Sequence, residues 1–323
     1  MQLYSRPVSP AQLLRRFLPW KGDPMKELIR KVLFLFFLAV FIVSIVFLAR
    51  YILSDYTTGR EYNDAQELFD GGTPAVDVDM PAGYRQQFGN LYSANADICG
   101  WLKIDGTAIN YPVVQGEDDD FYLTHTFRKS ENRVGVPFLE YLNDFTPDGM
   151  NHYCTIYAHN MKSGKMFHDL RYYKDVEYYK EHPLVSFNTV YEDYDWKIIG
   201  LFFTPGNPAQ EDALFYHQRL ENESTEEFYE FINALMQRSY FTTGVDVNEN
   251  DHFLFLSTCD TLDLNSRIVL AARRVRPGES AEVDVSAAEQ NYHQYFPRNY
   301  TDRIGSTYHE PDTNWVFYRP DAE

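Results

Sequence analysis

The stretch FLFLSTCDTLDLNSRIVLAARR, from Phe253 to Arg274, contains two apolar runs separated by a polar turn. Short runs rich in Phe, Leu, Ile and Val on either side of Asn, Asp and Ser are typical of adjacent β-strands. If Phe253–Thr258 and Arg267–Val275 form an antiparallel pair, Cys259 and Arg267 flank the connecting loop. The sequence therefore predicts a thiol and a guanidinium at one end of a sheet.

Similar short runs recur from Ile98 onward, separated by Gly, Asn and Asp. Many short strands with little helix are typical of a closed barrel or a sandwich. We therefore predict a mainly β fold. Its eight expected strands are Trp101–Ile104, Ile109–Val114, Val134–Glu140, Tyr153–Ala158, Leu184–Thr189, Asp195–Thr204, Phe253–Thr258 and Arg267–Val275.

One amphipathic helix is predicted between these strands, at Ser224–Ser239. Its apolar residues recur at helical spacing, and Ser224 with Glu227 has the pattern of a capping box. We expect the apolar face of this helix to pack on the barrel. Two short helices are predicted before the strands, at Glu61–Phe69 and Pro81–Leu91, and the residues after Pro277 are expected to be largely irregular.

An apolar segment near the N-terminus predicts a membrane anchor. Val32–Ala49 contains eighteen consecutive uncharged residues, which as a helix approach the roughly 30 Å of a bilayer core. Basic residues crowd the preceding flank, so the N-terminus is expected to stay in the cytoplasm. A cleaved signal peptide is the alternative, but its apolar core would be shorter. Translation could start at Met1 or at Met25.

The charge of the chain limits its partners. The whole chain has a formal net charge of −18, and the residues after the apolar segment are more acidic still. A nucleic-acid-binding protein needs a basic face to neutralise phosphates, so no nucleic acid partner is predicted. Peripheral binding to anionic lipid is disfavoured for the same reason.

The three cysteines, Cys99, Cys154 and Cys259, are too few and too scattered for a disulfide framework or a zinc site. One bridge between Cys99 and Cys154 remains open, and the odd cysteine is a candidate reactive thiol. The acidic run Glu117–Phe121 lacks the alternating ligand spacing of a calcium loop. We predict neither a metal ion nor a cofactor.

A thiol and a guanidinium on one rim have a chemical use. A thiolate that attacks an amide carbonyl creates an oxyanion, which Arg267 could stabilise. Because an ordinary thiol has a pKa of about 8.5, Cys259 also needs an imidazole to accept its proton. His159 ends the apolar run YCTIYA and so is expected at a strand end. On position it is a better candidate than His125, His168 or His182.

Three segments together resemble class B sortases, the Gram-positive cysteine transpeptidases that join secreted proteins to the cell wall. They are LSTC at Leu256–Cys259 followed by Arg267, YAHNMKSGKMFHDLRYY at Tyr157–Tyr173, and GWLKIDGTAINYPVVQ at Gly100–Gln115. The resemblance covers Asn95–Arg276. It implies an eight-stranded sortase-type β-barrel with N-terminal helices and one helix in the connection before the nucleophile strand.

The resemblance also implies roles for individual residues. Cys259 is expected to be the nucleophile, His159 the general acid and base, and Arg267 the group that stabilises the oxyanion and holds the substrate. We expect the residues beside them to bind substrate, namely Ser257, Thr258 and Asn160. Glu140 stands where an aspartate is common in the family, and the tail after Val275 exceeds a minimal catalytic domain.

The expected partners are secreted proteins with a C-terminal sorting signal, cleaved after threonine through a thioester. A peptidoglycan precursor or a pilin lysine is expected to supply the accepting amine. The chain would be a single-pass protein of the plasma membrane with an extracytoplasmic catalytic domain. Its expected parts are a cytoplasmic segment (1–31), the transmembrane anchor (32–49), a stalk with helices (50–94), the catalytic domain (95–276) and a tail (277–323).

Two alternatives remain open. A papain-like cysteine peptidase would also use a thiol and an imidazole, although its nucleophile commonly precedes the histidine and opens a helix. A non-catalytic, membrane-tethered binding module would need no reactive cysteine.

Overall fold

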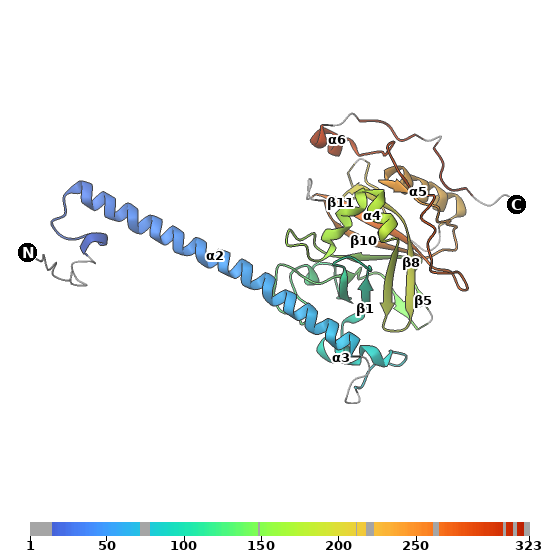
Figure 1. The fold of residues 1–323 in the computed structure, drawn as a ribbon, viewed down its shortest axis with the longest axis horizontal. Coiled ribbons are helices and arrows are strands. Elements are labelled where there is room, and N and C mark those ends of the chain that lie inside the picture. Colours follow the sequence, from blue (N-terminus) through green and yellow to red (C-terminus); the bar gives the residue numbers. More distant parts are fainter. Residues whose placement is uncertain are drawn as a thin grey trace, which may run out of the picture. The chain divides into compact units, whose positions relative to one another are not determined.

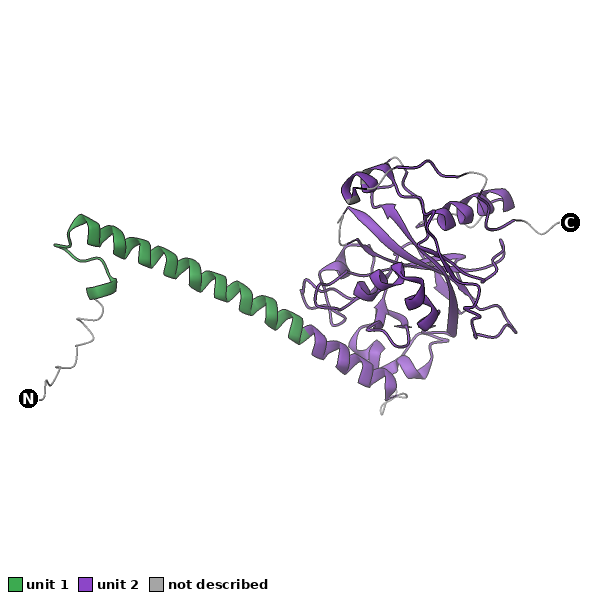
Figure 2. Cartoon of the chain, turned by 45° about the horizontal axis from the view of Figure 1, so that its top comes forward, with its two compact units in different colours: residues 1–57 green, residues 58–323 purple. Residues whose placement is uncertain are grey.

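The computed structural model describes residues 15–71, 78–147, 149–210, 212–217, 223–260, 265–305, 308–312 and 315–319 (Figure 1). The chain divides into two compact units, Met1–Thr57 and Thr58–Glu323, which Figure 2 colours separately.

A single long helix, α2, extends from Met25 to Asp70 and contains the predicted membrane anchor. No proline interrupts these 46 residues, so the backbone hydrogen bonds continue throughout. In the first unit the helix is long and apolar enough to cross a membrane. The predicted helix Glu61–Phe69 is the C-terminal part of α2, and there Tyr62, Ala65 and Phe69 pack into the core of the second unit.

The second unit is built on a closed barrel of eight strands, as predicted. Their order around the barrel is β1-β2-β3-β6-β10-β11-β8-β7, with parallel pairing between β2 and β3 and between β6 and β10. The strands are β1 (Ile98–Lys103), β2 (Asn110–Val114), β3 (Phe138–Leu139), β6 (Tyr153–Tyr157), β7 (Leu184–Thr189), β8 (Asp193–Pro205), β10 (Phe253–Cys259) and β11 (Ser266–Arg274).

Alternate residues of β10 belong to two different cores. Leu254 and Leu256 lie in the larger core, which they share with residues of β1, β2 and β7. Phe253 and Phe255 lie in a smaller core, between the barrel and helix α5 (Thr225–Arg238). Successive side chains of a strand point to opposite faces, so β10 is buried on both sides. Its continuous apolar run follows from this double burial.

Helix α5 forms where the amphipathic pattern predicts it. The Ser224 hydroxyl accepts a hydrogen bond from the Glu227 N–H, and the Glu227 carboxylate accepts one from the Ser224 N–H. The capping box is therefore confirmed. The predicted packing of the helix on the barrel is confirmed as well, because α5 supplies apolar side chains to the smaller core.

Several local predictions were wrong. Of Val134–Glu140 only β3 is a strand, because Gly135 has a φ of +64°, which ends the extended conformation. The helix predicted at Pro81–Leu91 begins later, as a short 3₁₀ helix η1 (Gln86–Phe88) followed by α3 (Gly89–Ala94). The Arg85 N–H donates instead to the Val190 carbonyl, which keeps the residue extended.

Other short elements have no strong sequence pattern. The helical ones are η2 (Phe121–Leu123), η3 (Phe167–Lys174) and α4 (Val176–Glu181). Like β3, the remaining strands have two residues each, namely β4 (Phe145–Thr146), β5 (Gly149–Met150), β9 (Phe241–Thr242) and β12 (Glu289–Gln290).

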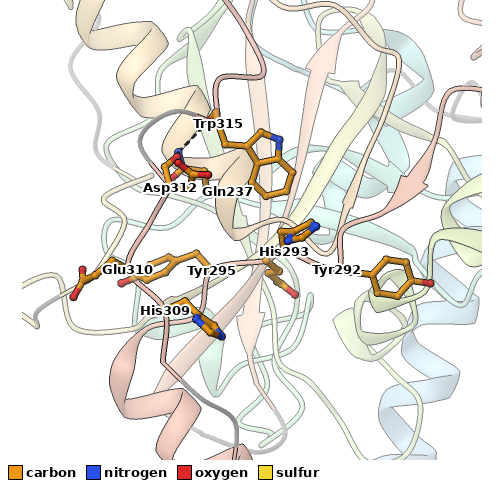
Figure 3. A pocket seen from close by; sticks show the side chains of 9 residues that line it. Gln237, Tyr292, His293, Tyr295, His309, Glu310, Asp312 and Trp315 are labelled. Atoms are coloured by element: carbon orange, nitrogen blue, oxygen red, sulfur yellow. Dashed lines mark hydrogen bonds between the residues drawn. The ribbon is translucent and has the colours of Figure 1, made fainter.

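The C-terminal segment after Pro277 is largely irregular, as predicted. It contains β12, which pairs with β9, and helix α6 (Arg298–Ile304), and it runs beside α5 (Figure 1). Asn233 of α5 binds the backbone of this segment with both ends of its amide. A cavity of about 470 Å³ lies between Gln237 of α5 and the segment, where Trp315 and His293 approach each other (Figure 3).

Candidate active site

The three predicted catalytic residues lie at the ends of three neighbouring strands. Cys259, the last residue of β10, pairs directly with Arg267 of β11. On its other side β10 runs parallel to β6, with Ser257 opposite Tyr157. His159 follows Tyr157 by two residues, as Cys259 follows Ser257, so both leave the sheet at the same level. Neighbouring strands lie about 4.8 Å apart, so Cys259 is placed between His159 on one side and Arg267 on the other.

Strand alternation indicates the side to which these residues point. Cys259 lies on the same face of β10 as Phe253 and Phe255, because alternate residues of a strand share a face. Both phenylalanines face α5. Arg267 has the same relation to Val269 of β11. These two side chains therefore point to the outer face of the barrel, beyond the part that α5 covers. His159, Cys259 and Arg267 are all partly exposed.

Exposure distinguishes Cys259 from the other two thiols. Cys99 and Cys154 are fully buried in the larger core, whereas Cys259 is partly exposed. Burial raises the pKa of Cys99 well above its usual value. A thiol that stays protonated is a poor nucleophile, so Cys259 is the candidate.

The ring of His159 is oriented by a hydrogen bond. Its Nε2 lies 2.8 Å from the carbonyl oxygen of Leu123, at the end of η2. Because a carbonyl can only accept, Nε2 carries the proton and Nδ1 is left as the basic nitrogen. In the part of the chain that the structure describes, no hydrogen bond joins this ring to the Cys259 sulfur. Such contacts often tighten only when substrate is bound.

The competing histidines have other environments. The ring of His125 stacks on Phe121, and His182 contacts the Asp105 carbonyl at 2.8 Å. His168 is buried, and its Nδ1 lies 3.1 Å from Oδ1 of Asn160. Burial, with a smaller contribution from Arg171, lowers the pKa of His168.

The guanidinium of Arg267 packs against the backbone at the end of β8. Its Nη1 donates to the Ser266 carbonyl at 3.3 Å. A Cβ atom placed on Gly206 would lie 2.9 Å from Nη1 and 2.6 Å from the Asn265 carbonyl oxygen. The guanidinium can occupy this position only because Gly206 has no side chain.

The three residues predicted to bind substrate use their side chains within the protein. The Ser257 hydroxyl lies 2.8 Å from the hydroxyl of Tyr216, and the Thr258 hydroxyl donates to the Ala158 carbonyl at 2.7 Å. Both are buried, with 1% and 3% exposed. Asn160 donates from Nδ2 to the Cys259 carbonyl at 3.0 Å.

An acidic cluster beside the site was not predicted as functional. Glu140 is fully buried, accepts a hydrogen bond from the Tyr157 hydroxyl at 3.1 Å and lies 3.6 Å from Nδ1 of His217. Burial, opposed by a backbone hydrogen bond from Tyr141, raises the pKa of Asp119 to about 6. In the sequence, the unusual glutamate at position 140 was the one signal of this cluster. Asp119, Tyr157 and His217 come near it through tertiary packing, which leaves no local sequence pattern.

Neither a metal site nor the cavity beside α5 coincides with these residues. The described ranges contain no group of three His, Cys, Asp or Glu side chains that could hold a metal ion. In the acidic run Glu117–Phe121, Asp118 instead accepts hydrogen bonds from the backbone of Asp120 and Phe121. The cavity in Figure 3 is lined by α5 and the C-terminal segment, without Cys259.

Comparisons with known proteins agree on one family. The chain is 31% identical to sortase B of Listeria monocytogenes over 231 residues, which cover 68% of this chain and 89% of the relative. A structure of sortase B from Bacillus anthracis in complex with AAEK1 matches with a TM-score of 0.59 and 27% identity, over 70% of this chain and all of that one. A substrate complex of Staphylococcus aureus sortase B matches with a TM-score of 0.59 and 25% identity, over 69% and 99%. No family model matches the chain.

A closed eight-stranded barrel of mixed pairing, together with these relatives, defines a cysteine transpeptidase of the sortase type. Within that class, the chain belongs to the sortase B family.

Proposed function

We propose that this protein is a membrane-anchored transpeptidase that cleaves C-terminal sorting signals of secreted proteins after a threonine. The observation that carries the proposal is the cross-strand pair of Cys259 with Arg267, next to the strand end that bears His159. The substrate complex of the Staphylococcus aureus sortase B supports a substrate-binding role for this fold.

The reaction follows from the three side chains. His159 accepts the thiol proton on Nδ1, and the Cys259 sulfur attacks the threonyl carbonyl carbon. Arg267 stabilises the resulting oxyanion. When the intermediate collapses, the C–N bond breaks, the imidazolium protonates the leaving amine and a thioester remains. An acceptor amine then attacks the thioester carbonyl, loses its proton to the imidazole and displaces the thiolate, which recovers a proton.

Ser257, Thr258 and Asn160 hold the site rather than the substrate in this proposal. Their side chains bind Tyr216, Ala158 and the Cys259 carbonyl, which keeps the ends of β10 and β6 at one level. Substrate would then contact the backbone and the partly exposed residues on the outer face.

The proposal includes the membrane topology. Residues 32–49 would form the transmembrane part of α2, with residues 1–31 in the cytoplasm because of their basic character. Residues 95–276 would form the catalytic domain outside the cell, connected by residues 50–94 and followed by the tail at 277–323. The acidic surface is unsuited to nucleic acid. The accepting amine would come from a peptidoglycan precursor or a pilin lysine.

The direct test uses the full-length protein in detergent with a panel of sorting-signal peptides. Mass spectrometry is expected to show an acyl adduct on the wild type and none on Cys259→Ala. Addition of an amine should convert the adduct into a transfer product. His159→Ala should abolish both steps. His293→Ala, which changes an exposed histidine of the C-terminal segment, should keep them.

The same assay distinguishes the alternatives. Hydrolysis without any transfer to an added amine would indicate a cysteine peptidase. A Cys259 that is alkylated no faster than a free peptide thiol, and that forms no adduct, would indicate a binding module.

A further inference from the structure

The residue after the nucleophile is a buried carboxylate. Asp260 is fully buried, and its N–H donates to the Ser266 carbonyl at 3.0 Å, one step beyond the pair of Cys259 with Arg267. Because neighbouring residues of an extended chain point to opposite sides, Asp260 faces inward where Cys259 faces outward. The inward side chain can therefore fix the strand end that presents the thiol.

A lysine from η3 neutralises this carboxylate. Nζ of Lys174 lies 3.0 Å from Oδ2 of Asp260, and it also lies 5.3 Å from the centroid of the Tyr240 ring. A buried carboxylate is strongly unfavourable unless it is paired, so Lys174 stabilises Asp260 in its buried position.

The C-terminal segment holds Lys174 in turn. Nε2 of Gln290, in β12, donates to the Lys174 carbonyl at 3.0 Å and to the Tyr240 carbonyl at 2.8 Å. Its Oε1 accepts from the Val176 N–H at 2.9 Å. One amide thus binds the junction of η3 with α4 and the chain that follows α5.

The next residue strengthens the same attachment. The Asn291 N–H donates to the Tyr240 carbonyl at 2.9 Å, and Nδ2 donates to the Ser239 carbonyl at 2.8 Å. Asn291 is buried, so these bonds are shielded from water.

We infer that the C-terminal segment at Gln290 is a positioning element for the nucleophile. Gln290 fixes Lys174, Lys174 fixes Asp260, and Asp260 fixes the end of β10 that carries Cys259. The inference rests on the proposed role of Cys259 and goes beyond it, because it gives the tail a part in the transfer reaction. In this proposal each of the three acts through the next residue rather than on the substrate.

Steady-state transfer kinetics and the alkylation rate of Cys259, both in the full-length protein, test this link. Gln290→Ala is expected to lower kcat about tenfold or more with little change in KM, since a displacement of about 1 Å can cost up to about 10²-fold. The alkylation rate of Cys259 should change in the same variant. Lys174→Met should have a similar effect, and the double variant should lose little more than either single variant.

Gln237→Ala is the matched control. Nε2 of Gln237 also donates to two carbonyls of the C-terminal segment, but these are the carbonyls of Asp312 at 3.0 Å and Trp315 at 3.3 Å, and within the described ranges Gln237 makes no hydrogen bond to Lys174. It should lower the melting temperature by a similar amount while kcat and alkylation stay as in the wild type. If Gln290→Ala and Gln237→Ala have the same kinetics, the inference is wrong.

Two further variants keep the outcomes distinct. Lys174→Arg retains the cation and should recover most of the activity that Lys174→Met loses; equal activity of the two would overturn the inference even if Gln290→Ala does not fold. Cys259→Ala tests the underlying function separately. A transfer activity that survives Cys259→Ala would refute the proposed nucleophile, whereas an inactive Cys259→Ala beside an unaffected Gln290→Ala would refute only the role of the tail.

Discussion

The three thiols of this chain show how strongly a single residue depends on its place in a strand. Cys154 lies inside β6 and faces the larger core, where it is fully buried. Cys259 ends β10 on the outer face and is partly exposed. Asp260 comes one residue later and faces inward. A shift of one residue along β10 would therefore exchange the nucleophile with a carboxylate.

Gly206→Ala is predicted to disturb the oxyanion site without touching the thiol. The new Cβ would lie 2.9 Å from Nη1 of Arg267 and 2.6 Å from the Asn265 carbonyl oxygen, so the guanidinium and its strand end must move. We expect kcat/KM to fall about tenfold or more. Steady-state transfer kinetics measure this loss.

Gly59→Ala is the control for that variant. Its Cβ would meet only the flexible end of Lys165, at 3.3 Å, and alanine favours the helix in which Gly59 lies. Activity should therefore be retained. An unchanged kcat/KM in Gly206→Ala would show that the placement of Arg267 does not matter to the reaction.

At the scale of elements, an ion-pair network links the end of β11 to residues outside the barrel. Arg273 of β11 is fully buried and contacts Asp246, Asp251 and Glu279. Glu279 also pairs with Lys197 of β8, at 2.7 Å. This network attaches the start of the C-terminal segment to the two longest strands.

Ser224→Ala is predicted to destabilise the protein through α5. It removes the acceptor for the Glu227 N–H in the capping box, at a cost of about 1 kcal/mol in the free energy of unfolding. Urea-induced unfolding measures the change. Thr225→Ala, at the exposed first position of the helix, should be nearly neutral, and equal losses in both variants would argue against a contribution from the capping box.

The ion network predicts an acid-sensitive contribution to stability. Hydrogen bonds from Arg273 and then Lys197 hold the pKa of Glu279 well below its usual 4.5. A depressed pKa in the folded state contributes stability that is present above about pH 4.5 and is lost as the pH falls below it. The free energy of unfolding of the wild type should therefore decrease toward acid pH more steeply than that of Glu279→Gln.

Urea unfolding at a series of pH values between about 7 and 3 tests this difference. Glu177→Gln is a suitable control, since Glu177 is exposed and pairs with Lys180 in its own helix. Parallel acid slopes in the wild type and Glu279→Gln would contradict the prediction.

The sequence predicted the elements whose pattern is local. β10, β11 and α5 were within one or two residues of their observed bounds, because apolar runs, turns and a capping box mark their ends. η3 and α4 were missed, since their aromatic residues follow no clear period. The role of the tail was missed because Gln290 binds carbonyl groups, which every residue possesses.

For the candidate site too, the sequence predicted the local part and not the part that depends on tertiary packing. Cys259 and Arg267 face each other across one turn, so their pairing follows from the sequence of that turn. Their approach to His159 depends on parallel pairing between β10 and β6, which no local pattern specifies. The positions of Tyr216, Glu140 and His217 beside the site depend entirely on tertiary packing.

At the scale of the whole molecule, the two compact units have different relations to solvent. The first exposes a continuous apolar helix surface from Val32 to Ala49, whereas the second buries its apolar side chains in two cores. Large exposed apolar surfaces mark sites of protein or membrane interaction, and the length and composition of this helix would suit a membrane.

Removal of residues 1–57 is therefore predicted to convert the protein from a detergent-dependent to a water-soluble form. The full chain should remain in the membrane fraction after alkaline carbonate washing, and residues 58–323 should stay in the supernatant. Both forms should melt at similar temperatures, because the cores lie in the second unit. Loss of the full chain from the membrane fraction would contradict the anchor.

The insertion of β10 between β6 and β11 also determines when the thiol can become reactive. The Thr258 hydroxyl donates a hydrogen bond to the Ala158 carbonyl across a sequence separation of 100 residues. Contacts of such range form late in folding. A nascent chain that has emerged only as far as β8 already contains the imidazole but no nucleophile, and the edge of its β6 is unpaired. We therefore expect acylation to begin only after synthesis is nearly complete. The unfinished polypeptide would then be unable to attack neighbouring proteins during export.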